Sequence, residues 1–129
     1  MRLAQLDHVN VRTADLEAMI EWYGRVLDLK PGARPPFKFP GAWLYAGDVA
    51  AIHLLEVNRA PKAGDLRLEH FAFSATGLTE FIARLEREGV DYRTRKVPEW
   101  GILQVNLWDP DRNHIHVDFS PEEAVEAGL

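Results

Sequence analysis

The stretch that decides the fold is LDHVNVRTADLEAMIEWYG at residues 6–24, because its beginning returns later in the chain. Residues 6–11, LDHVNV, align with residues 68–73, LEHFAF, at an offset of 62. With one further residue of shift, Ile-His-Leu at 52–54 aligns with Ile-His-Val at 115–117. An internal repeat on this scale predicts two copies of one structural module.

Each copy changes its hydrophobic period along the chain, from about 2 in the opening segment to about 3.6 in the next, which predicts a strand followed by a helix. Thr13 or Asp15 can cap the first helix, and Pro31 and Gly32 are expected to stop it. Gly89 is expected to end the second helix. The helical stripes are Leu16, Met19, Ile20, Tyr23, Val26 and Leu27 in the first copy, and Leu78, Phe81, Ile82 and Leu85 in the second.

Three extended runs follow each helix, so each copy is expected to be a βαβββ module in an α+β domain. In the second copy the runs are residues 90–97, 100–108 and 113–119, separated by Pro98 and by the turn-forming residues 109–113. We expect one domain, with module 1 at about 3–58, a connector at 59–65 containing Pro61 and Gly64, module 2 at about 66–119 and a tail at 120–129. The tail is long enough for one short helix.

The amino-acid composition limits the kinds of site and partner that the chain can have. The 129 residues include no Cys, which excludes thiolate nucleophiles and thiolate metal sites and leaves His, Asp and Glu as metal ligands. The formal net charge of −5 disfavours nucleic acid and anionic membranes, so a small-molecule partner is expected. No apolar run reaches the length of a membrane span and no secretory signal opens the chain. A cytoplasmic protein is expected.

Four histidines occupy equivalent positions in the two copies of the repeat. Residues two apart in a strand share a face, and the apolar neighbours of these histidines mark the opposite, helix-covered face. All four histidines are therefore expected on the face without helices. A shared divalent cation would satisfy all four lone pairs at once, which predicts a metal site. The four are His8, His53, His70 and His116.

The same alternation predicts a lined pocket beside these histidines. Aromatic and amide side chains in one strand share a face, which is typical of a ligand-binding hollow, although a plain core role explains each aromatic ring equally well. His114 also shares a face with His116, where it is expected to form hydrogen bonds and is not counted among the ligands. The expected substrate-binding residues are Trp43, Trp100, Gln104, Asn106 and Trp108.

The chain resembles the vicinal oxygen chelate superfamily, which includes glyoxalases, bleomycin-resistance proteins and extradiol dioxygenases. The resemblance covers about residues 3–119 and is carried by LDHVNVRTADLEAMIEWYGRVLDLKPG, LEHFAFSATGLTEFIARLEREGVDY and DPDRNHIHVDF. It implies that two βαβββ modules pair, within one chain or between two, into a curved, partly closed mixed sheet around a cavity with the helices outside. A homodimer is expected.

The resemblance also implies that the metal ligands come from the first and last strands of each module, which maps them onto His8, His53, His70 and His116. Many relatives end on a pattern similar to DPDGNxIEL, in which the glutamate is a ligand and moves protons. In this chain His116 stands where that glutamate would be, Arg112 replaces the glycine, and His53 stands where relatives often carry Glu or Gln. His53 and His116 are therefore the candidate catalytic residues, and glyoxalase activity does not transfer directly.

A neutral set of imidazoles favours Zn, Fe, Ni, Co or Cu over Mg or Ca, and it leaves a charge of +2 that favours a chelating, oxygen-rich substrate. Isomerase, lyase and dioxygenase chemistry stay open. The competing interpretation is a binding protein without metal, of the antibiotic-sequestering kind, in which tryptophans stack on a flat ligand. The basic run at 93–96 has two interpretations as well: guanidinium forks for a carboxylate or phosphate, or a solvated strand that discourages edge pairing.

Overall fold

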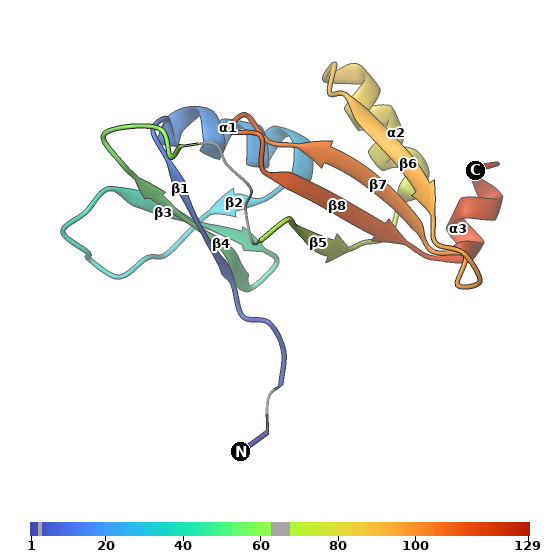
Figure 1. Ribbon diagram of the computed structural model, residues 1–129, viewed down its shortest axis with the longest axis horizontal. Helices are drawn as coiled ribbons and strands as arrows, with labels where there is room; N and C mark the ends of the chain where they lie inside the picture. Colours follow the sequence, from blue (N-terminus) through green and yellow to red (C-terminus); the bar gives the residue numbers. More distant parts are fainter. Residues whose placement is uncertain (3, 63–67) are drawn as a thin grey trace. The chain divides into compact units, whose positions relative to one another are not determined.

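The computed structural model describes residues 1–2, 4–62 and 68–129, and the chain divides into two compact units, Met1–Gly64 and Asp65–Leu129 (Figure 1). Each unit is built from one four-stranded mixed sheet and at least one helix. This confirms the α+β class and the βαβββ order of both modules, and neither sheet closes into a barrel. The connector predicted at 59–65 lies partly outside the described residues, which omit 63–67.

The first unit has strand order β1-β4-β3-β2, with β1 parallel to β4 and the other pairs antiparallel. Its elements are β1 (Val9–Thr13), α1 (Leu16–Leu27), β2 (Lys30–Pro31), β3 (Gly41–Ala46) and β4 (Val49–Glu56). The second unit repeats this topology as β5-β8-β7-β6, with β5 parallel to β8. Its elements are β5 (His70–Ser74), α2 (Leu78–Arg87), β6 (Tyr92–Lys96), β7 (Leu103–Trp108), β8 (His114–Phe119) and α3 (Pro121–Glu126).

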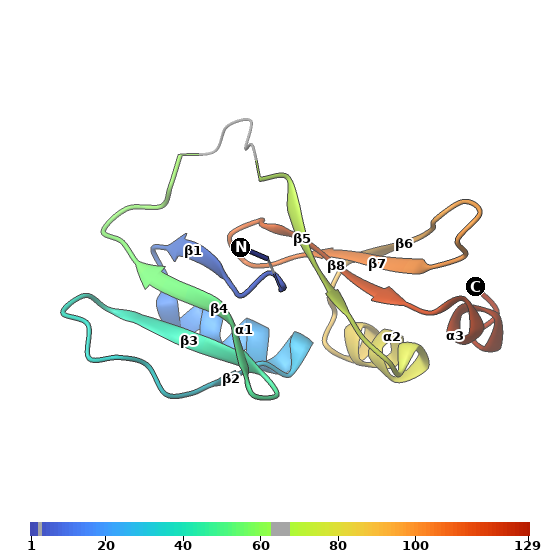
Figure 2. The same cartoon turned by 90° about the horizontal axis from the view of Figure 1, so that it is seen from below.

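The cores follow the predicted periodicities. In the first unit α1 packs on β2, β3 and β4, and Met19, Tyr23 and Val26 on its inner face are fully buried (Figure 2). The second core takes alternate residues of β7 and β8, together with two leucines of α2. Its buried residues include Leu78, Leu85, Leu103, Val105, Leu107, Ile115, Val117 and Phe119. Because the helix side of each sheet is apolar, the polar residues between these positions lie on the opposite face.

Local signals set most element ends. Asp15 caps α1 by accepting a hydrogen bond from the backbone amide of Ala18 at 3.1 Å. The predicted stop at Pro31 and Gly32 is wrong, because the helix ends at Leu27, where Asp28 adopts a left-handed conformation with φ of 56°. The end predicted at Gly89 is confirmed, with α2 finishing at Arg87 and Gly89 at φ of 63°.

The predicted strand over 100–108 begins too early. The strand β7 starts at Leu103, and residues 98–100 form a turn; Glu99 within this turn and Gly101 just after it both take positive φ. Left-handed backbone at two nearby positions breaks the pleat, so the side-chain alternation does not extend back to Trp100. Trp100 instead lies at this turn with 73% of its surface exposed. The opening strands also start late, at Val9 and His70, which leaves Asp7 and His8 just before β1.

None of the described helices is long and apolar enough to cross a membrane.

Candidate metal centre

The first unit brings two of the predicted ligands together on the sheet face opposite its core. His53 lies on β4 between the buried residues Ile52 and Leu54, and its ring is stacked with that of His8 at a centroid distance of 3.8 Å. The ring of Trp43 stacks with His53 as well, at 3.9 Å and an angle of 6° between the planes. His53 is therefore held between a histidine and a tryptophan. Trp43, predicted to contact substrate, has one face against His53.

Burial and the neighbouring charge of His8 lower the pKa of His53, while a backbone hydrogen bond at Ala50 and the charge of Asp7 oppose them. A lowered pKa favours the neutral ring, which is the form that binds a metal.

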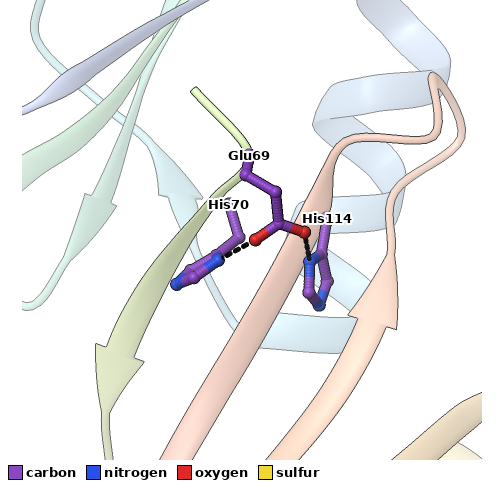
Figure 3. A group of neighbouring side chains, drawn as sticks. All are labelled: Glu69, His70 and His114. Atoms are coloured by element: carbon purple, nitrogen blue, oxygen red, sulfur yellow. Dashed lines mark hydrogen bonds and ion pairs between the residues drawn. The ribbon is translucent and has the colours of Figure 1, made fainter. Parts of the chain in front are cut away.

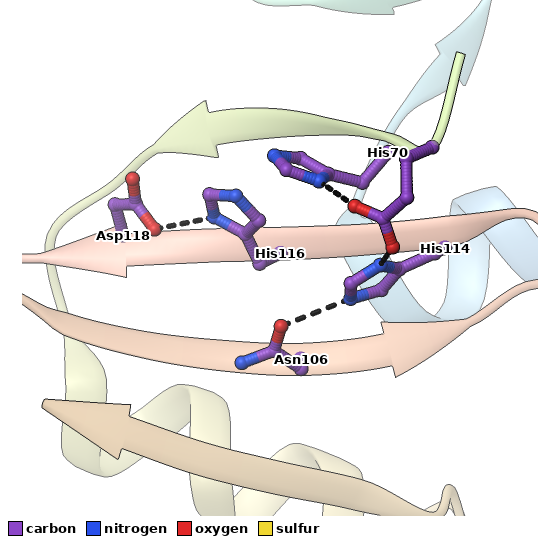
Figure 4. A network of polar contacts seen from close by, with 6 residues as sticks. His70, Asn106, His114, His116 and Asp118 are labelled. Atoms are coloured by element: carbon purple, nitrogen blue, oxygen red, sulfur yellow. Dashed lines mark hydrogen bonds and ion pairs between the residues drawn. The ribbon is translucent and has the colours of Figure 1, made fainter. Parts of the chain in front are cut away.

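The second unit brings His70 and His116 together on the open face of its own sheet. His70 lies at the start of β5 and His116 on the neighbouring strand β8, and their ring centroids are 4.6 Å apart (Figure 4). His116 is the more enclosed, with 7% of its surface exposed. His8 and His53 belong to the first unit, so the convergence of all four histidines stays a prediction.

In three of these histidines the same ring nitrogen, Nδ1, is hydrogen-bonded to a carboxylate. Nδ1 of His8 lies 2.6 Å from the carboxylate of Asp7, and Nδ1 of His116 lies 2.6 Å from that of Asp118. Nδ1 of His70 is hydrogen-bonded to the carboxylate of Glu69. Ionised carboxylates only accept, so Nδ1 carries the proton in each case, and in the neutral ring the lone pair is on Nε2. This is how proteins commonly orient metal-binding histidines.

Glu69 also reaches a second histidine. Its other oxygen lies 2.9 Å from Nδ1 of His114, so one carboxylate bridges two rings (Figure 3). Hydrogen bonds from His70 and His114 lower the pKa of Glu69, which keeps this exposed carboxylate ionised at neutral pH. Ligand atoms of Glu69, His70 and His114 all lie within 4.8 Å of one another, a spacing that a metal ion can span.

The hydrogen bonds of His114 work against its use as a ligand. Its Nε2 lies 2.9 Å from the side-chain oxygen of Asn106, whose amide nitrogen is directed at the backbone oxygens of Arg93 and Gln104. Both nitrogens of His114 are thus engaged in hydrogen bonds, to Glu69 and to Asn106. A site that uses His70 and His116 differs in this respect, because Nε2 of each ring remains available to bind a metal. His114 forms the hydrogen bonds that the sequence predicts.

The remaining predicted residues line the same face of the second sheet in part. Trp108 pairs with His114 across β7 and β8, and the two rings stack at 5.1 Å. Asn106 pairs with His116, and Gln104 pairs with Asp118. Trp100 is outside this group, at the exposed turn described above.

Sequence reasoning missed Asp7 and Glu69 as partners of the histidines. The signal was present, because each carboxylate directly precedes a histidine at matching stations of the repeat. A third carboxylate, that of Asp118, lies two residues beyond His116 on β8 and is hydrogen-bonded to it.

Comparison with known proteins agrees with the fold. A family model described as the Glyoxalase/Bleomycin resistance protein/Dioxygenase superfamily matches residues 5–117. A protein of Arabidopsis thaliana named Glyoxylase I 4 is 34% identical over 119 residues, which cover 86% of this chain and 68% of that protein.

Two solved structures share the fold. A glyoxylase/bleomycin resistance protein/dioxygenase domain from Frankia sp. EAN1pec has a TM-score of 0.76 and 22% identity, covering 92% of this chain and 99% of its own. Lactoylglutathione lyase from Agrobacterium tumefaciens has a TM-score of 0.70 and 17% identity, covering 95% of this chain and 98% of its own.

Proposed function

Because the chain belongs to the Glyoxalase/Bleomycin resistance protein/Dioxygenase superfamily, we propose that it is a metal-dependent enzyme acting on a small oxygenated molecule. The relative named Glyoxylase I 4 supports enzymatic activity. The substrate is proposed to bind the metal through two adjacent oxygens. Isomerase, lyase and dioxygenase chemistry are all compatible with such a complex.

The observation that carries this proposal is the shared use of Nδ1. His8, His70 and His116 each give Nδ1 to a carboxylate, so their Nε2 atoms remain for a metal. With His53 they make a set of four neutral imidazoles suited to Zn, Fe, Ni or Co. His8 and His53 belong to the first unit, and His70 and His116 belong to the second. A bound metal would act as a Lewis acid that polarises a substrate oxygen.

Residues of the chain orient the ligands and supply hydrogen-bonding groups at the proposed site. Asp118 accepts the Nδ1–H of His116 and fixes the orientation of its ring, which leaves Nε2 available at the site. His53 and His116 are the proposed catalytic residues. The ionised carboxylate of Glu69 supplies a hydrogen-bond acceptor on the same sheet face as His116, but it is engaged by two histidines.

Metal content tests the proposal. Protein purified without added metal and then incubated with Zn, Ni or Co should hold close to one ion per chain by elemental analysis. The variant His70→Ala should lose the ion, because it removes a ligand. The matched variant His114→Ala should keep it, because both nitrogens of His114 are already hydrogen-bonded to Glu69 and Asn106.

Two results would contradict the proposal. A protein that stays empty after incubation would instead be a metal-free binding protein, with Trp43 and Trp108 as stacking surfaces. Equal loss of metal from His70→Ala and His114→Ala would move the site to the group of Glu69, His70 and His114.

A further inference from the structure

Two arginines share the open face of the second sheet with the histidines. In the register of β6, β7 and β8, Arg93 pairs with Asn106, which pairs with His116. In the next row Arg95 pairs with Gln104. Directly paired residues project to the same side of a sheet, so both guanidinium groups belong to the face that carries His116.

The side chain of Arg93 is turned inward across this face. Its guanidinium carbon lies 5.7 Å from the ring centroid of Trp108, close enough for a cation–π contact. Trp108 in turn stacks on His114, whose Nδ1 is bonded to Glu69. Arg93 therefore ends a connected row of side chains that runs from the edge strand to the histidines.

Protection of the sheet edge does not account for this arrangement. The strand β6 is an edge strand, and charged residues there discourage pairing with other chains. Edge protection needs charge but not two arginines on one face, one of them folded back over a tryptophan. The neighbouring Lys96 is used differently, since its Nζ donates to the backbone oxygen of Leu129 at 3.0 Å.

Both arginine side chains also have guanidinium N–H groups that remain available to a ligand. Among the described residues, neither Arg93 nor Arg95 forms an ion pair with a carboxylate. Two exposed guanidinium groups on neighbouring rows present a planar set of N–H donors, which matches the geometry of a carboxylate or a phosphate.

We propose that Arg93 and Arg95 bind an oxyanion, carboxylate or phosphate, of the small molecule that this site takes. The inference rests on the proposed function and narrows its substrate class. Neighbouring strands are about 4.8 Å apart, so β6 is about 10 Å from β8 and His116. The substrate is then a molecule with an oxygen pair at one end and an oxyanion at the other.

The experiment uses metal-free protein, so that its outcome does not depend on metal binding. Inorganic phosphate and succinate are titrated separately at constant ionic strength, and the NMR signals of the arginine Nε–H groups are followed. The signals of Arg93 and Arg95 should shift on saturation. Each of Arg93→Gln and Arg95→Gln should weaken binding about tenfold, the size expected for one charge-assisted hydrogen-bonded contact. Arg87→Gln removes the same charge from the exposed face of α2 and should leave binding unchanged.

The two ligands separate the two oxyanions, because whichever binds more tightly identifies the group recognised. Binding that survives in the double variant Arg93→Gln/Arg95→Gln, or that falls equally in Arg87→Gln, would overturn the proposal. So would the absence of any shift at Arg93 and Arg95. An unchanged thermal unfolding midpoint in the double variant shows that lost binding is not lost folding. Failure of the metal experiment with success here would reject the enzyme and keep the oxyanion site.

Discussion

At the residue scale, the histidines differ in what holds them. His116 is almost enclosed and shares a short hydrogen bond with Asp118, whereas His8 and His70 lie at the exposed starts of their strands beside Asp7 and Glu69. Enclosure and a fixed partner reduce the freedom that a ring must lose on binding a metal. His116 is therefore the best-oriented of the proposed ligands.

Replacing Asp118 by Asn tests this orientation. The amide removes the ionised acceptor on Nδ1 of His116 and lowers the basicity of Nε2, so metal affinity should fall about 10- to 100-fold. Isothermal titration with Zn measures the change. Asp91→Asn, an equal loss of charge at an exposed position just before β6, is the control. If both variants bind as the parent does, Asp118 does not orient a ligand.

The pKa of His53 gives a second prediction. Because burial and the charge of His8 lower it, His53 in the metal-free protein should titrate below the ordinary value for histidine. NMR of the ring protons measures the midpoint, and His8→Ala should move it upward by removing the neighbouring charge. A midpoint at or above the ordinary value would contradict the stacked arrangement.

The same shift has a consequence for stability. Between the lowered pKa and the ordinary one, the unfolded chain binds a proton at His53 that the folded chain does not. The free energy of unfolding contributed by this group should therefore rise with pH through that window and level off on either side of it.

At the scale of elements, the turn between β7 and β8 fixes the start of β8, the strand that carries His114 and His116. Asp109 is 2% exposed and accepts hydrogen bonds from both the backbone and the side-chain amide of Asn113, each at 2.8 Å. Arg112 takes a positive φ of 69°. It stands at the glycine position of the DPDGNxIEL pattern that this stretch resembles. The carboxylate of Asp109 fixes the chain immediately before His114.

Replacing Asp109 by Ala should destabilise the protein by about 1–3 kcal/mol, because it leaves the part-buried donors of Asn113 without their acceptor. Urea unfolding measures the loss. Asp111→Ala, in the same turn but exposed, should change the free energy of unfolding by less than about 0.5 kcal/mol. Similar losses from the two substitutions would show that general turn propensity, and not the Asp109 hydrogen bonds, holds this turn.

The repeat predicts the elements well where one periodic signal dominates. Both helices, the order of strands and the buried faces of β7 and β8 follow from the spacing of apolar residues. The errors lie where backbone conformation overrides composition. Asp28 ends α1 through a left-handed cap before Pro31 is reached, and Glu99 and Gly101 turn the chain before β7 begins. Nothing in the residue types of Asp28 or Glu99 announces a positive φ strongly enough to predict it.

At the scale of the whole molecule, the two units repeat one topology and each carries two of the proposed ligands. The sequence predicts the matching stations, because the strands bring equivalent positions to equivalent faces. It misses the partners Asp7 and Glu69, since their contacts depend on side-chain rotamers just outside the strands. The pairing of modules around a cavity, and the homodimer, stay predictions that light scattering and metal titration at several protein concentrations can test.

The most direct test of the account is a long-range ¹H–¹⁵N NMR spectrum of the zinc-loaded protein, which shows which histidine nitrogens bind the metal. We expect coordination through Nε2 of His8, His70 and His116 and through one ring nitrogen of His53, with one zinc ion per chain. Retained Nδ1–H signals on His8, His70 and His116 would accompany it. A spectrum in which zinc shifts the nitrogens of His114 but leaves those of His8 and His116 unchanged would contradict it.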